Sequence, residues 1–298
     1  MGRRADRARE ARAAGAGAGA SAGAGAAKRH PLIAGNWKMN KDTCAAALLA
    51  QDILNRANPQ YAADADIVLC PPFTDLKTVR TVLEYERSDI MLGAQDVFYE
   101  ADGAYTGAIS AAMLQELRCA YCIIGHSERR QYFKETSAEI AQKAAALEAV
   151  QIRPILCVGE GPEVRAGGAD AAEAFVVGQL NQVLEHLNLE NWEKLVVAYE
   201  PIWSIGTGDT ATPESAQGMA AALRASLAER LGNEVAERVR ILYGGSLRPE
   251  NAAFFAGLAD IDGGLIGGAS LVAEDFVSLV QAWIAAAKEA AKEAADQA

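Results

Sequence analysis

Short apolar runs alternate with amphipathic stretches along the chain from residue 31 onward. Each run is bounded by glycine, proline or charged residues, and a stretch with apolar residues at helical spacing follows it. This alternation predicts eight buried strands, each followed by helical sequence, over residues 32–34, 66–70, 90–94, 120–125, 152–158, 195–200, 239–243 and 261–266.

Helix-start signals support the same division of the chain. Thr136 and Glu139 have the spacing of a capping box, and Thr212 followed by Pro213 is typical of a helix N-terminus. The last helix is predicted to bury one apolar face, made of Phe276, Leu279, Val280, Trp283 and Ile284.

The number and order of these repeats indicate the fold class. A doubly wound sheet usually has fewer strand–helix units or a second domain, whereas eight units in one domain of this length are typical of a barrel. We therefore predict an α/β protein with a single (β/α)8 barrel, the TIM-barrel architecture, over residues 31–298.

Residues 1–30 differ in composition from the rest of the chain. They hold seven Lys or Arg against two acidic residues, a charge of +5, which leaves −16 on the remainder of a chain whose total is −11. Residues 13–27 are alanine and glycine with one serine, so they have nothing to bury. We expect a disordered Ala/Gly/Arg-rich extension that is dispensable for folding, with an organellar targeting peptide as the alternative.

Composition excludes several classes of function. The acidic balance argues against nonspecific nucleic-acid binding, and no apolar run is long enough to cross a bilayer. Five cysteines without a secretory signal indicate reduced thiols and a cytoplasmic location. Cys119 and Cys122 have the spacing of a redox pair, but they lead into a predicted strand, so we expect them to be buried apolar residues.

Candidate chemistry stands where the strands end, because the sites of such barrels lie at the carboxyl ends of the strands. Asn36 and Lys38 follow the first strand, His126 follows the fourth, and Glu200 ends the sixth. A carboxylate and an imidazole at one barrel mouth suit proton transfer. The alternatives are a surface salt bridge for Glu200 and a structural role for His126.

The segment after Glu200 resembles a lid over a site. Pro201 stops strand pairing, residues 202–205 are mostly apolar, and glycines at 206 and 208 provide a hinge. The alternative is an ordinary glycine-rich turn.

Glycine pairs follow the last two strands. Gly244 and Gly245 precede Ser246, and Gly267 and Gly268 follow the eighth strand. Phosphate sites in barrels are commonly built from these two loops, where glycines leave backbone N–H groups accessible. Each pair alone could be a tight turn, but their joint position predicts a phosphate site.

Six motifs in this order give the chain a specific resemblance over residues 31 to about 285. It is similar to the triosephosphate isomerase family in the segments AGNWKMN, GAYTG, IIGHSERR, YEPIWSIGTG, YGGS and IGGASL. The resemblance implies an intramolecular aldose–ketose isomerase of glycolysis and gluconeogenesis. It would interconvert dihydroxyacetone phosphate and D-glyceraldehyde 3-phosphate through an enediolate, with neither cofactor nor metal, as a homodimer.

The resemblance also assigns roles to residues. In this family, a standard example of pKa tuning, Glu200 would be the base and His126 a neutral electrophile. Lys38 and Asn36 would hold the substrate and its oxyanion. The resemblance implies further substrate contacts at Gly206, Ser246, Gly267 and Gly268. It implies supporting residues at Ser127 and Glu128, and dimer-interface residues at Gln95 and Thr106.

Two positions depart from the family's usual pattern. Ser204 stands in the lid where alanine is usual, and Asp209 follows the lid where lysine is frequent. The remaining alternatives for the whole chain are another phosphate-binding barrel, such as an indole-glycerol-phosphate synthase or a phosphoribosyl isomerase, and a binding protein that uses its basic tail.

Overall fold

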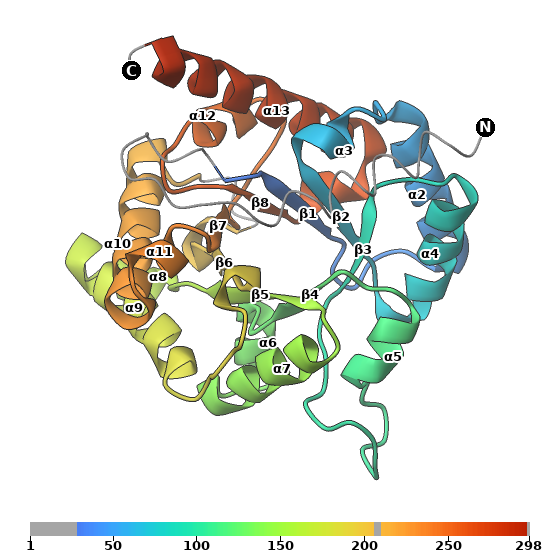
Figure 1. Cartoon of the computed structure of the whole chain (residues 1–298), viewed down its shortest axis with the longest axis horizontal. Helices are drawn as coiled ribbons and strands as arrows, with labels where there is room; N and C mark the ends of the chain where they lie inside the picture. The colour runs from blue at the N-terminus through green and yellow to red at the C-terminus, as the bar shows by residue number, and fades with distance from the viewer. Residues whose placement is uncertain (1–28, 206–209, 297–298) are drawn as a thin grey trace.

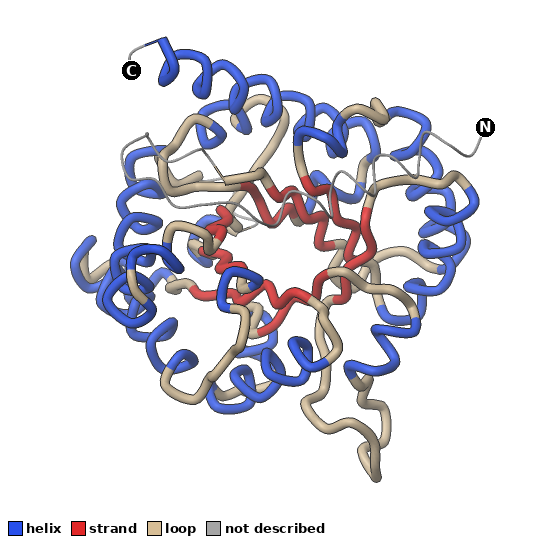
Figure 2. Tube along the Cα trace, in the orientation of Figure 1, coloured by secondary structure: helices blue, strands red, loops and turns tan. Residues whose placement is uncertain are grey.

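Eight parallel strands close into a barrel in the computed structural model, which describes residues 29–205 and 210–296. Each strand pairs with the next in chain order, and β8 pairs with β1. Figure 2 shows the closed ring of strands at the centre of a ring of helices. The strands are β1 Leu32–Asn36, β2 Asp66–Cys70, β3 Met91–Ala94, β4 Tyr121–Ile124, β5 Arg153–Val158, β6 Val196–Tyr199, β7 Arg240–Tyr243 and β8 Gly263–Ile266. The predicted barrel is confirmed.

Helices cover the outside of the barrel, as Figure 1 shows. The α-helices in the described residues are α2 Thr43–Arg56, α3 Tyr61–Asp64, α4 Leu76–Tyr85, α5 Ala111–Glu116, α6 Ser127–Tyr132, α7 Ser137–Ala149, α8 Pro162–Arg165, α9 Ala169–Leu184, α10 Pro213–Leu231, α11 Asn233–Ala236, α12 Ala252–Ala256 and α13 Ala273–Asp296. Single 3-10 turns are η1 Phe73–Asp75, η2 Trp192–Lys194, η3 Ile202–Ser204 and η4 Gly268–Leu271.

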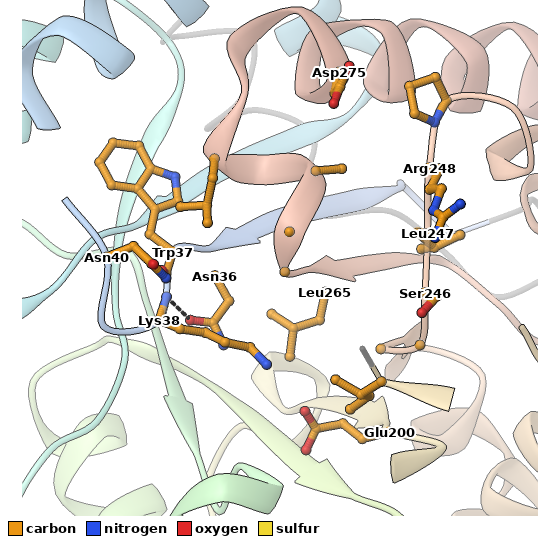
Figure 3. A pocket seen from close by; sticks show the side chains of 18 of the residues that line it. Asn36, Trp37, Lys38, Asn40, Glu200, Ser246, Leu247, Arg248, Leu265 and Asp275 are labelled. Atoms are coloured by element: carbon orange, nitrogen blue, oxygen red, sulfur yellow. Dashed lines mark hydrogen bonds between the residues drawn. The ribbon is translucent and has the colours of Figure 1, made fainter. Parts of the chain in front are cut away.

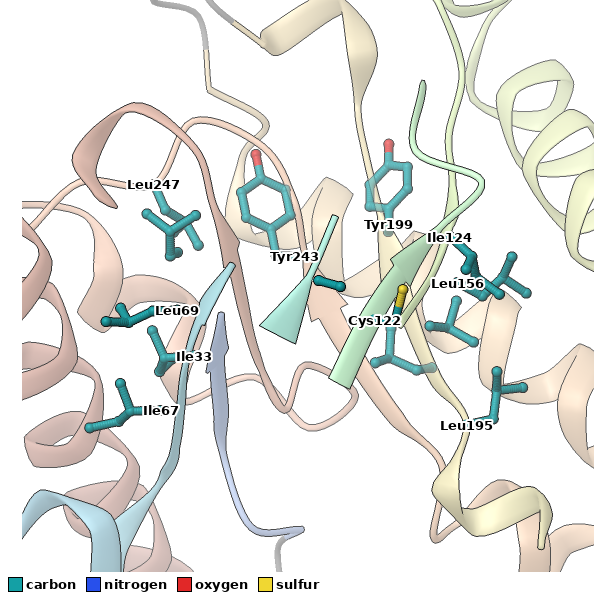
Figure 4. Packing of buried hydrophobic residues seen from close by; sticks show 14 of the residues in the cluster. Ile33, Ile67, Leu69, Cys122, Ile124, Leu156, Leu195, Tyr199, Tyr243 and Leu247 are labelled. Atoms are coloured by element: carbon teal, nitrogen blue, oxygen red, sulfur yellow. The ribbon is translucent and has the colours of Figure 1, made fainter. Parts of the chain in front are cut away.

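The strands are buried on both faces, because alternate side chains point to opposite sides of the barrel wall. On β1, Leu32 and Ala34 pack inside the barrel, whereas Ile33 packs outward against the helices. Figure 4 shows part of this outer layer, in which Ile33 and Leu69 lie among the residues between strands and helices. Two apolar layers therefore fix the position of every strand end.

The predicted helix signals are confirmed. Thr136 and Glu139 form a reciprocal capping box on α7, and Thr212 caps α10 with Pro213 as its first residue. All five predicted apolar residues of α13 are buried. No helix in the described residues is both long and apolar enough to cross a membrane.

The cysteines are unpaired, and four of them are buried. Burial raises the pKa of the Cys119 thiol to about 12 and that of Cys122 well above its ordinary value. A raised pKa disfavours the reactive thiolate, and the prediction that both are buried residues is confirmed.

Arg29 departs from its predicted place in a dispensable extension. Its guanidinium binds Asp262 Oδ1 at 2.7 Å, Glu237 Oε2 at 3.0 Å and the carbonyl of Ala259 at 2.7 Å. The Asp262 side chain is fully buried. Arg29 therefore joins the segment before β1 to the segments before β7 and β8. The rest of the expected extension, residues 1–28, lies outside the described residues.

The expected dispensability of the extension therefore ends before Arg29. A chain that starts at Arg29 should keep the melting temperature and turnover of the full chain. Arg29→Met should lower the free energy of unfolding by about 1–3 kcal/mol, because buried Asp262 loses a charged donor. Urea unfolding measures this cost. The control is Arg56→Met, whose partner Asp52 is half-exposed, with an expected cost under about 1 kcal/mol. Equal costs for the two variants would contradict the assignment.

Candidate active site

A cavity of about 470 Å³ opens at the carboxyl ends of the strands. Its lining brings together seven of the residues that the sequence predicted for the site. Figure 3 shows Lys38 reaching across this cavity in the direction of Glu200, with Asn36 beside the lysine and hydrogen-bonded to its backbone. The seven are Asn36, Lys38, His126, Glu200, Ser246, Gly267 and Gly268. Gly206, the eighth predicted contact, lies outside the described residues, as does Asp209.

Glu200 follows directly after β6 and is only 2% exposed. Its backbone N–H binds the carbonyl of Val158 on the neighbouring strand, which fixes its main chain. Gly244, at the end of β7, gives the side chain its room. A Cβ at that position would lie 3.0 Å from Glu200 Cγ. The glycine pair after β7 thus allows close packing against the carboxylate, in addition to any role toward phosphate.

The carboxylate of Glu200 is fully paired in this structure. Its Oε1 lies 2.8 Å from His126 Nε2, and its Oε2 accepts a hydrogen bond from Ser127 N at 2.9 Å. Burial is the largest single influence and disfavours the ionised form, but His126, the Ser127 N–H and Lys38 together outweigh it and lower the pKa of Glu200. Glu200 is therefore an ionised carboxylate that is withheld from water.

His126 is buried at the N-terminus of α6, where it faces two opposing influences. Its Nδ1 accepts a hydrogen bond from Glu128 N at 3.2 Å, so the neutral ring carries its proton on Nε2, toward Glu200. Burial is the largest single influence and disfavours the cation, but the carboxylates of Glu200 and Glu128 together outweigh it and raise the pKa of His126. The imidazole is thus coupled to the carboxylate as one titrating pair.

Lys38 lies across the cavity and is held by contacts to its backbone. Its φ is +52°, in the left-handed region that non-glycine residues rarely adopt. Its N–H binds Asn36 Oδ1 at 3.0 Å, and its carbonyl accepts from Gln95 Nε2 at 2.8 Å. The ammonium lies 2.7 Å from Glu128 Oε1. Glu128, which the family resemblance implied as a supporting residue, therefore balances the charge of Lys38 in this structure.

The predicted phosphate residues lie at the far end of the same cavity. Ser246 donates from Oγ to the carbonyl of Ser204 at 2.8 Å, which joins the loop after β7 to the loop after β6. A Cβ built on Gly268 would meet nothing within 4 Å, so its backbone borders open space. Arg248, also in the lining, is an exposed cation that the sequence analysis missed although it follows Ser246 by two residues.

The loop after Glu200 is anchored by a residue that the sequence analysis also missed. Glu160 is fully buried and its Oε1 accepts from Trp203 Nε1 at 2.8 Å and from Tyr199 Oη at 3.0 Å. Its position in the sequence could have identified it, because Glu160 follows β5 just as the other site residues follow their strands. Residues 202–204 form the turn η3, with Ser204 buried.

The two predicted interface residues lie outside the cavity. Gln95 binds the carbonyls of Lys38 and Cys70 and so supports the site from behind. Thr106 is exposed on the loop between β3 and α5, which protrudes from the barrel in Figure 1.

The described residues contain no cluster of three or more His, Cys, Asp or Glu side chains suited to a metal ion. The cavity is lined by the pair of Glu200 with His126 and by the Lys38 ammonium, which binds Glu128. Its other polar side chains are those of Asn36, Asn40, Ser246, Arg248, Glu250 and Asp275. Such a set can move protons and stabilise an anion.

The fold and this cavity define a (β/α)8-barrel enzyme with an acid–base site at the carboxyl ends of its strands. The family model described as triosephosphate isomerase matches residues 31–283. The chain is 48% identical to the triosephosphate isomerase of Herpetosiphon aurantiacus, over 85% of this chain and 99% of the relative. It is 48% identical to that of Chloroflexus aurantiacus over 85% and 98% of the two chains. For the protein from Caldanaerobacter subterraneus subsp. tengcongensis, the identity is 45% over 85% and 99%. The chain belongs to the triosephosphate isomerase family.

The coupled pair predicts how stability depends on pH. A lowered Glu200 pKa contributes stability that is present above the ordinary value of 4.5 and lost as pH falls through the lowered pKa. A raised His126 pKa contributes stability that is present below 6.5 and lost as pH rises through the raised pKa. The free energy of unfolding of the wild type should therefore exceed that of Glu200→Gln by the largest amount between pH 4.5 and 6.5. Urea unfolding across pH measures the difference, and a pH-independent difference would contradict the pairing.

Proposed function

We propose that the chain interconverts dihydroxyacetone phosphate and D-glyceraldehyde 3-phosphate, the reaction named in its family, as a step of glycolysis and gluconeogenesis. The observation that carries this proposal is that three groups surround one cavity: the ionised Glu200, the imidazole of His126, which can be neutral, and the Lys38 ammonium. The family match also argues against the other phosphate-binding barrels considered above.

In the proposed reaction Glu200 is the base. It takes a proton from C1 of dihydroxyacetone phosphate, and the electron pair of that C–H bond forms the enediolate, whose negative charge resides on oxygen. Return of the proton to C2 gives the aldose. The hydroxyl proton moves from O1 to O2 in the same conversion, and His126 Nε2 is the group placed to exchange it.

Lys38 and Asn36 supply the electrostatic part. The ammonium of Lys38 and the amide of Asn36 are donors directed at the developing oxyanion, and their backbones are fixed before substrate arrives. Glu200 must leave its contact with His126 to reach a substrate carbon. The imidazole then loses the carboxylate that raises its pKa, so burial favours the neutral ring that donates to O2.

The phosphate is proposed to bind at the far end of the cavity. Ser246 and the backbone of Gly267 and Gly268 provide the donors, and η4 begins there. Gly206 remains a predicted contact. Ser127 would position Glu200 through its N–H, and Glu128 would hold Lys38 until substrate binds.

A homodimer is proposed as the working form. Four large apolar side chains are exposed around the loops after β1, β3 and β4, and Met39, next to Lys38, is 95% exposed. A second copy of the chain would cover such a surface, with the loop at Thr106 reaching the partner's site. The other three are Tyr105, Tyr132 and Phe133.

The proposed setting is the cytoplasm, without cofactor, metal, nucleic acid or membrane. Unpaired, mostly buried cysteines suit a reducing compartment. The net charge of −11 opposes binding to nucleic acid. A separate role for the basic extension stays untested.

The roles of the two central residues are tested by activity. Glu200→Gln keeps shape but removes the base, and Lys38→Ala removes the cation, so each should reduce kcat by about 10²–10⁴-fold. A coupled assay in both directions, with no metal or nucleotide added to the isomerisation step, measures the loss. Glu229→Gln, on the exposed side of α10, is the matched control and should be fully active. A Glu200 or Lys38 variant within tenfold of wild type would remove that residue from the mechanism.

The proposed dimer is tested at the protruding loop. Thr106→Arg should yield monomers with very low activity, because the partner's Lys38 and Asn36 lose a neighbouring surface. Sedimentation and kcat, measured at the same protein concentration, report the two effects. Thr81→Arg, on an exposed position of α4, should stay dimeric and active. Fully active Thr106→Arg monomers would contradict the proposal.

A further inference from the structure

A side chain that the mechanism above does not use joins the ends of β4 and β5. Arg130, on α6, donates from Nε to the carbonyl of Gly125 at 2.8 Å and from Nη2 to the carbonyl of Cys157 at 3.1 Å. The last residue pair in the register of these strands is Ile124 with Leu156. Gly125 and Cys157 lie one residue further on each strand, so the guanidinium replaces the next rung of the ladder. Its planar fork suits two acceptors at once.

The two carbonyls that Arg130 binds belong to segments next to both reacting groups, His126 and Glu200. Gly125 is the residue before His126, so a hydrogen bond to its carbonyl fixes the peptide that carries the imidazole. Cys157 is buried near Glu200, so that burial and the charge of Glu200 both raise the pKa of the Cys157 thiol. Through its two carbonyl contacts, Arg130 holds the backbone on which the acid–base pair rests.

The backbone at Gly125 is shaped for this contact. Its φ is +64°, a left-handed value that favours glycine. A Cβ at this position would lie 2.9 Å from Ile140 Cδ1 and 3.1 Å from Arg130 Nη2. The turn into His126 therefore depends on a residue without a side chain and on a cation packed against it.

Arg130 also brings a positive charge near Glu200. The guanidinium is partly buried, and burial lowers the pKa of Arg130 while the charge of Glu200 opposes that shift. The charged and titratable groups that face Glu200 are His126 from the start of α6, Lys38 from the loop after β1, Cys157 from β5, and Arg130 from α6. Lys38 also faces solvent and Glu128, whereas Arg130 stays fixed against the barrel wall.

We propose that Arg130 is a positioning residue for the isomerisation, whose fork fixes the main chain before His126 and whose charge supports the ionised form of Glu200. The inference rests on the proposed function, because it assigns Arg130 a part in the same reaction. Arg130 does not line the cavity of about 470 Å³, so it acts through other residues and not on substrate.

Two variants separate the hydrogen bonds of the planar guanidinium, which we call the fork, from its positive charge. Arg130→Met removes both, so kcat should fall by about 10–100-fold through misplacement of His126. KM should change by less than about threefold, since substrate contacts remain. The acid limb of kcat/KM should move to higher pH, because Glu200 loses a favourable charge. Arg130→Lys keeps the charge without the fork, so its acid limb should stay near the wild-type position while kcat falls less than in Arg130→Met.

Arg224→Met is the matched control for a purely structural role. Arg224 is also an arginine that binds two main-chain carbonyls, those of Ala236 and Val239, but it is more deeply buried than Arg130 and lies at the opposite end of the barrel. This variant should lose thermal stability and keep the wild-type kcat and pH profile below its melting temperature.

The outcomes discriminate clearly. Arg130→Met with wild-type kcat and acid limb would overturn the inference, as would the same kinetic changes in Arg224→Met. If Arg130→Met does not fold, Arg130→Lys decides, and a wild-type kcat in that variant overturns the role of the fork. An inactive wild type would instead refute the proposed function, whereas an active wild type with unaltered Arg130 variants refutes only the inference.

Discussion

Glu200 is an ionised carboxylate at a position that is 2% exposed, and a buried charge of this kind is stable only with partners. His126 and the N–H of Ser127 are those partners, and both stand at the start of α6. Much of the surrounding structure follows from this pairing. Gly244 leaves room for the side chain, and Lys38 places a cation across the cavity. The pairing keeps the base charged while water is excluded, which is the state that proton abstraction from carbon requires.

A second set of contacts holds the first set in place. Gln95 binds the carbonyl of Lys38 in its left-handed conformation, and Glu160 holds Trp203 in the loop after β6. Arg130, in our proposal, does the same for the peptide before His126. These side chains come from different strands and helices, so the geometry of the site depends on closure of the whole barrel. The apolar layers on both sides of the wall supply that rigidity.

The sequence predicted the fold well because burial in a barrel leaves a local pattern. All eight strands were placed within two residues of their observed ends. The error at the fourth strand has a physical reason, since Gly125 turns into the left-handed region and leaves the ladder. Seven site residues were found because they follow strand ends or match motifs. Arg29 and Arg130 were not predicted, because their partners are defined by folding: Arg29 meets Asp262, which lies 233 residues away. The roles of the site residues, and Gly206 in particular, stay predictions.

The central claim, that Glu200 moves a proton between two carbons through an enediolate, is tested most directly by running the reaction in D₂O. Purified protein is given dihydroxyacetone phosphate, with no metal added, the aldose is trapped by a coupled dehydrogenase that oxidises its aldehyde with NAD⁺, and deuterium at C2 is measured by NMR. A carboxylate that holds the abstracted proton exchanges it with solvent, so the account predicts product that carries deuterium at C2, and almost no product from Glu200→Gln. Product formed at the wild-type rate without deuterium would indicate direct hydride transfer and contradict the account, as would an absence of product.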